Sequence, residues 1–118
     1  MNKWVVGLEK MVEPNSSAAV ESESLPRGNI HSLRFYAKDV LEGSLVKRGL
    51  DILVQIQSGQ RNLTMPSKGV LIEAFRGKEL RGFHIPESGR VKLTFTNNTD
   101  IPRTVYAVLT MAFPDSAT

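Results

Sequence analysis

The sequence predicts an all-β protein: a single β-sandwich or jelly-roll-like domain preceded by an extended N-terminal arm. From Ile30 onward, apolar residues recur at every second position, which is the spacing of a half-buried strand. Gly, Pro, Asn and Ser interrupt these runs at short intervals, as turns between short strands require. The 118 residues suffice for one domain.

Residues 1–28 form the predicted arm, and residues 29–118 form the predicted β-sandwich domain. Residues 11–29 are rich in Ser, Glu and Pro and hold few large apolar groups with which to offset the entropy of ordering. Ahead of them, the segment Trp4–Leu8 is apolar. Such a segment either docks onto a partner or forms a first strand of the same domain, and the sequence leaves both interpretations open.

Alternation predicts the strands of the domain and the residues that each turns toward the core. Shorter strands are expected over Val70–Phe75 and Leu80–Ile85, between glycine- and proline-containing turns. The inward-facing residues are predicted to be Leu33, Phe35 and Ala37 in the first long strand, Ile52, Val54 and Ile56 in the second, and Val91, Leu93 and Phe95 in the third.

The last predicted strand, Thr104–Phe113, is apolar on both faces. A sandwich strand requires only one buried face, so the second face should be covered by the Trp4–Leu8 segment, by another subunit or by a larger partner. The candidate partner-binding residues are therefore Trp4, Val5, Val6, Leu8, Tyr106 and Val108.

The formal net charge of +3 is unevenly distributed. Residues 1–28 hold three basic and four acidic side chains, whereas residues 29–118 hold twelve basic and eight acidic ones. Basic residues interleaved with aromatic ones can bind single-stranded nucleic acid, but Glu79 and Glu87 dilute the charge, and an ordinary solvated surface is the favoured interpretation, so we do not expect a nucleic-acid partner. The residues in question are Arg76, Lys78, Arg81, Arg90 and Lys92, with Phe75 and Phe83 between them.

No pattern of residues predicts an enzyme, a cofactor or a metal. The chain has no cysteine, no glycine-rich phosphate loop and no nucleophile elbow. Its two histidines, His31 and His84, lack a carboxylate or second histidine at metal-ligand spacing, and the parity of His84 places it on the surface. We therefore expect no catalytic, cofactor-binding or metal-binding residues. We also expect no membrane segment, because no run approaches the ~20 apolar residues needed.

The segment Gly89–Thr110 resembles the closing hairpin of small β-sandwich proteins found in tailed-phage virions. The layout of a polar arm before a compact β-domain is similar to that of capsid decoration, or cement, proteins. The resemblance implies a structural virion protein that stabilises a capsid by contacting the major capsid protein or another virion protein. It also implies a homo-oligomer, such as a trimer, located in the virion after assembly in the host cytoplasm. The alternative is a small β-sandwich module that binds carbohydrate or single-stranded nucleic acid.

Overall fold

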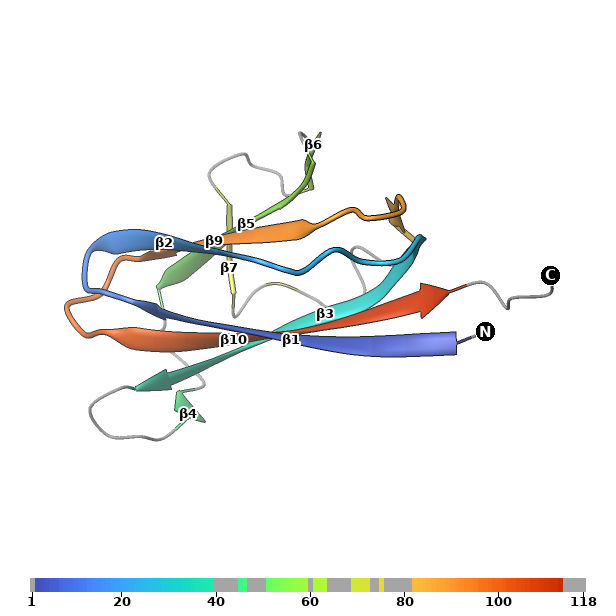
Figure 1. Cartoon of the computed structure of the whole chain (residues 1–118). Coiled ribbons are helices and arrows are strands. Elements are labelled where there is room, and N and C mark those ends of the chain that lie inside the picture. The colour runs from blue at the N-terminus through green and yellow to red at the C-terminus, as the bar shows by residue number, and fades with distance from the viewer. Residues whose placement is uncertain are drawn as a thin grey trace, which may run out of the picture.

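In the described part of the chain, two antiparallel sheets of five strands each face one another across a single core (Figure 1). The computed structural model describes residues 2–39, 45–46, 51–59, 61–63, 69–72, 75 and 82–113. The predicted all-β class and the two-sheet, sandwich-like architecture are confirmed. Parts of two predicted short strands, residues 73–74 and 80–81, lie outside the described residues.

Long strands form the middle of each sheet: β10 and β3 in sheet A, and β9 and β5 in sheet B. Sheet A has the order β1, β10, β3, β4, and β8 also pairs with β3. Sheet B has the order β2, β9, β5, β6, and β7 also pairs with β5. The strands of sheet A are β1 (Asn2–Val12), β3 (Gly28–Asp39), β4 (Leu45–Val46), β8 (His84–Ile85) and β10 (Arg103–Phe113); those of sheet B are β2 (Ser16–Glu21), β5 (Ile52–Ser58), β6 (Arg61–Asn62), β7 (Val70–Leu71) and β9 (Val91–Asn97).

The chain changes sheet after almost every long strand. It runs through β1, β2, β3 and β5 in sheets A, B, A and B, and it ends with β8, β9 and β10 in sheets A, B and A. The first and last strands therefore become neighbours in sheet A (Figure 1). Most of the pairing is between residues far apart in the sequence. We expect the protein to fold slowly, because long loops must close before these strands can pair.

The core follows the predicted alternation. The inward-facing residues of β5 and β9 are almost fully buried, and those of β3 are buried or partly buried. Phe35 of sheet A meets Phe95 of sheet B edge to face, with 5.9 Å between ring centroids. This geometry is favourable for aromatic pairs and fixes the two sheets against each other.

The predicted separate arm is wrong, because residues 2–25 are built into the fold. β1 pairs with β10 over eleven residues, and β2 pairs with β9 over six. The polar composition misled the prediction because β2 lies at a sheet edge, where only Ala18 and Val20 pack on the core. Beyond β2, the buried Ser22 accepts a hydrogen bond from the Val91 N–H at 2.9 Å, and the Leu25 N–H donates to Gly89 at 2.8 Å. The alternative, a first strand of the same domain, therefore describes Trp4–Leu8.

A buried asparagine closes one end of the sandwich. The side-chain amide of Asn97 donates to the carbonyls of Val12 at 3.2 Å and Ile101 at 2.8 Å. Its Oδ1 accepts from the Thr99 N–H at 3.0 Å and from the Thr99 hydroxyl at 2.6 Å. Asn97 thus joins the end of β1, in sheet A, to the end of β9, in sheet B.

Substitution of Asn97 by alanine should lower the free energy of unfolding by about 2 kcal/mol or more, because it leaves buried carbonyl and N–H groups without partners. Urea denaturation followed by tryptophan fluorescence measures this. The control is Asn98→Ala, at the exposed neighbouring position, which should change stability by less than about 0.5 kcal/mol. Equal effects at the two positions would contradict the conclusion that Asn97 holds this end of the sandwich together.

Deletion of residues 1–28 should abolish the cooperative unfolding transition. The deletion removes β1 and β2 and leaves long edges of β10 and β9 unpaired. Thermal melting and a two-dimensional amide NMR spectrum of the truncated chain test this. A dispersed spectrum and a sharp melt would show that residues 29–118 fold alone, as the arm interpretation required.

Candidate functional site

The outward-facing side of sheet A is set by the pairing register. Residues directly opposite one another in antiparallel strands point to the same face. Because Val105, Ala107 and Leu109 are buried in the core, Tyr106 and Val108 of β10 point the other way. We define the outer face of sheet A as Val5, Gly7, Glu9 and Met11 of β1, Ser32, Arg34 and Tyr36 of β3, and Thr104, Tyr106, Val108 and Thr110 of β10.

This outer face exposes apolar side chains. Val5 is 60% exposed, and Met11 and Tyr36 are each 45% exposed. None of the described strands lies over it, since both sheets of the sandwich are accounted for. The outer face of sheet B is more mixed: the register places Ser17, Gln55 and the threonines of β9 on it together with Leu53 and Leu71. An exposed apolar sheet face marks a contact surface more strongly than a polar one does.

The structure separates the six predicted partner-binding residues. Val5, Tyr106 and Val108 lie together on the outer face of sheet A. Val6 and Leu8 have the opposite parity and pack against the core. Trp4 shares their parity, is 50% exposed at the sheet edge and contacts Phe113 with 5.9 Å between ring centroids.

The Trp4–Leu8 segment lies beside the last strand in the same sheet and does not cover its second face. Sequence reasoning missed Met11 and Tyr36, which complete the exposed apolar surface. Alternation places both on outward faces, but only the register brings Tyr36 next to Tyr106.

A groove of about 420 Å³ runs along the free side of β1. One wall is formed by Trp4–Leu8, and the other by Glu21 at the end of β2 and by the residues after it, including Glu23 and Leu25. The groove lies on the open side of the sandwich, where both edge strands, β1 and β2, are found. It therefore combines an apolar wall, a strand edge and two carboxylates.

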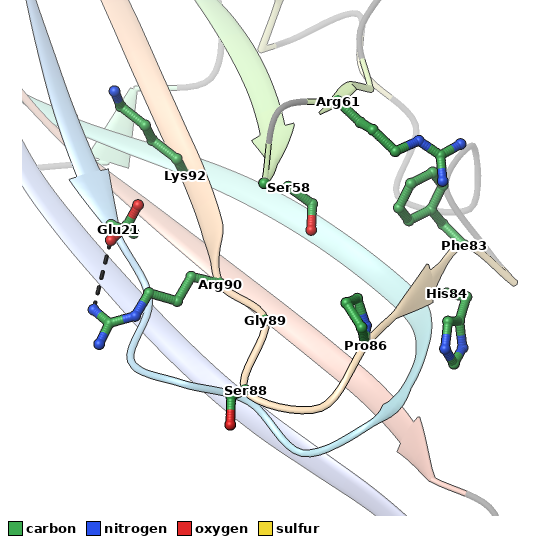
Figure 2. A pocket seen from close by; sticks show the side chains of 11 residues that line it. Glu21, Ser58, Arg61, Phe83, His84, Pro86, Ser88, Gly89, Arg90 and Lys92 are labelled. Carbon is green, nitrogen blue, oxygen red and sulfur yellow. Dashed lines mark ion pairs between the residues drawn. The ribbon is translucent and has the colours of Figure 1, made fainter.

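A larger and more basic pocket lies where β2 and β5 end and β9 begins (Figure 2). Its volume is about 640 Å³. Arg90 and Lys92 stand on one side, and Arg61 and Phe83 on the other (Figure 2). We call it the basic pocket.

Two of the cations in the basic pocket already have partners. The Arg61 guanidinium lies 4.8 Å from the centroid of the Phe83 ring, a cation–π contact. Arg90 Nη1 lies 3.5 Å from Oε1 of Glu21, and both side chains are about half exposed. Such an exposed pair contributes little to stability, so Arg90 can exchange Glu21 for another anion at small cost.

The basic pocket gathers part of the predicted basic stretch. Arg90, Lys92 and Phe83 line it, whereas Arg76, Lys78 and Arg81 lie outside the described residues. Arg61 was missed, because it lies far from the stretch in sequence and reaches Phe83 only through the fold.

His84, at the rim of the basic pocket, is exposed as predicted, with Nδ1 3.2 Å from Oδ1 of Asn29. Within the described ranges, His, Asp and Glu side chains form no group of three that could hold a metal ion. The same ranges contain no helix long and apolar enough to cross a membrane.

Comparison of the sequence with protein-family models gave no matching family, and comparison with curated proteins gave no match. The functional argument therefore depends on the geometry of the outer face of sheet A, the β1 groove and the basic pocket.

Proposed function

We propose that the protein is a non-enzymatic structural module that acts through protein–protein contacts. The observation that carries this proposal is the exposure of Val5, Met11 and Tyr36 on a sheet face over which no described strand lies. Backbone pairing on both sides of β10 and β3 holds the residues of this face in place, so they lose little entropy when a partner docks. Tyrosine and arginine, present here as Tyr36, Tyr106 and Arg34, are enriched at protein interfaces.

In its finer form, the proposal is a virion decoration or cement protein whose partner is the major capsid protein or another virion protein. The strand order supports it: when β4 and β6 are left aside, β1, β10, β3 and β8 in one sheet and β2, β9, β5 and β7 in the other follow the pattern of a jelly roll. Jelly rolls build viral capsid domains, and they also build lectins and cupins. The proposed location is the virion, after assembly in the host cytoplasm.

A capsid lattice would amplify a modest contact. Each copy of a decoration protein meets the same surface repeated many times, so moderate affinity per contact suffices once copies are linked. The outer face of sheet A suits such a contact because its apolar groups are few and interspersed with Glu9 and Arg34. A protein with this surface can stay soluble alone and still bind a lattice.

Substitution of Tyr36 by glutamate should weaken binding to the partner by about tenfold or more, because it places a charge at the apolar face. The measurement is co-sedimentation of the purified protein with assembled capsids of the virus that encodes it. Gln55→Glu, on the outer face of sheet B, is the matched control and should bind like the unmodified protein. Equal binding by the two variants, or no binding by the unmodified protein, would contradict the proposal.

The basic pocket favours a second candidate function, the binding of single-stranded nucleic acid. Arg61, Arg90 and Lys92 can contact phosphates, and the Arg61–Phe83 stack offers a plane for a base. The alternative of carbohydrate binding has less support, because the described aromatic side chains of this pocket are limited to Phe83.

Binding of a fluorescent oligothymidine to the purified protein should weaken steeply as salt rises, and Arg61→Ala and Lys92→Ala should each reduce it several-fold. Lys10→Ala, on the exposed part of β1, is the control and should have no effect. Undetectable binding at low salt, or equal loss in all three variants, would remove this candidate.

A further inference from the structure

One edge of sheet A is a long, regular strand with a free side. β1 pairs with β10 in an unbroken register from Asn2 to Val12. Among the described residues, no strand pairs with its other side. β1 also contains no proline and no bulge. Such an edge presents a row of backbone N–H and C=O groups and is a template for another strand.

We propose that this edge is occupied by β1 of a second copy of the chain, which pairs antiparallel about a twofold axis through Gly7. The two copies would then share one continuous sheet. This inference rests on the proposed function as an assembly protein and names one contact through which it assembles.

The parity of the strand restricts the register. A continuous sandwich requires inner-face residues of one β1 to lie opposite inner-face residues of the other, so the twofold axis must pass through a residue. An axis at Gly7 pairs the whole strand and leaves no overhang. It places Val6 opposite the partner's Leu8, Trp4 opposite the partner's Lys10 and Val5 opposite the partner's Glu9.

The groove along β1 matches the chemistry of the strand that would fill it. On its inner face β1 carries Val6, Leu8 and Lys10 in succession. The arriving strand therefore brings two apolar groups to an apolar wall. It also brings an ammonium to a groove lined by Glu21 and Glu23. A lysine on a sheet edge usually discourages pairing, but here it would meet the Trp4 ring and carboxylates.

Gly7 itself supports the position of the axis. A Cβ added to Gly7 would meet nothing within 4 Å, so the fold of one chain does not require glycine there. An isolated glycine inside a strand often marks the close approach of another backbone. At the axis, Gly7 would lie opposite Gly7 of the partner subunit.

The first test is a disulfide across the axis. Paired Cα atoms in antiparallel strands are about 4.5–5.5 Å apart, within the range of about 4.4–6.8 Å for disulfides. The chain has no cysteine, so Gly7→Cys gives an unambiguous readout. Mild oxidation should convert this variant almost completely into a covalent dimer. Met11→Cys, exposed on the same strand, is the control and should form no covalent dimer, since the two sulfurs would lie about 25 Å apart.

The second test introduces a negative or a positive charge at position 5. Val5 is 60% exposed, so one chain tolerates a charged residue there, which circular dichroism can check. Opposite the partner's Glu9, Val5→Glu should raise the dimer dissociation constant about tenfold or more, whereas Val5→Lys should leave it unchanged or lower it. Light scattering over a range of protein concentrations measures both.

A monomer at all concentrations would overturn the inference. So would a dimer that neither cross-links through Gly7→Cys nor responds to Val5→Glu. Tyr36→Glu, on β3, should leave the dimer intact. A dimer that persists without particle binding would therefore contradict only the proposed function, and particle binding by a monomeric chain would contradict only this inference.

Discussion

The pairing of β10 on both of its sides is the constraint on which the rest of the structure depends. This strand contacts β1 along eleven residues and β3 along ten. Its inner residues supply Val105, Leu109 and Met111 to the core. β1 has no other strand partner within the described residues, so the first strand of the chain is held by the last. Sheet A is therefore complete only when both ends of the chain are present.

The central position of β10 also explains why both of its faces are apolar. Tyr106 and Val108 are partly buried although no strand of the described part of the chain lies above them, because the flanking strands place Tyr36 on one side and Gly7 and Glu9 on the other. The sequence suggested that a second apolar face must be covered by something. In the structure, much of that covering is lateral. What remains for a partner is the more exposed rim formed by Val5, Met11 and Tyr36.

Alternation was sufficient to predict the inner residues of β3, β5 and β9, because burial on one face of a strand is a local property of the sequence. It failed for residues 1–28, because an edge strand such as β2 can be mostly polar and still be ordered by backbone pairing. The role of Asn97 could not be predicted either. Asparagine is common before turns, and the local sequence does not show whether such an asparagine is buried or exposed.

The candidate sites were predictable only in part, for a related reason. The outward residues of β10 could be read from their parity, but the neighbours that complete a surface come from distant strands. Tyr36 joins Tyr106, and Arg61 joins Phe83, through contacts that no sequence spacing encodes. Register and strand order are decided by the whole core, so surfaces that span several strands are the last features to become predictable.

The edge and the face of sheet A point in different directions, although Val5 belongs to both, and this matters for assembly. Pairing through β1 uses backbone groups in the plane of the sheet, whereas the outer face points out of that plane. A twofold axis perpendicular to the sheet keeps the inner faces together and leaves both outer faces pointing in the same direction. The pair would then offer two copies of the Val5, Met11 and Tyr36 surface to one lattice, with the gain in avidity that linked sites provide. A trimer could not form through this contact, because an antiparallel pair of identical strands closes at two subunits. The proposed edge pairing and the proposed face binding would thus be compatible, and each would make the other more effective.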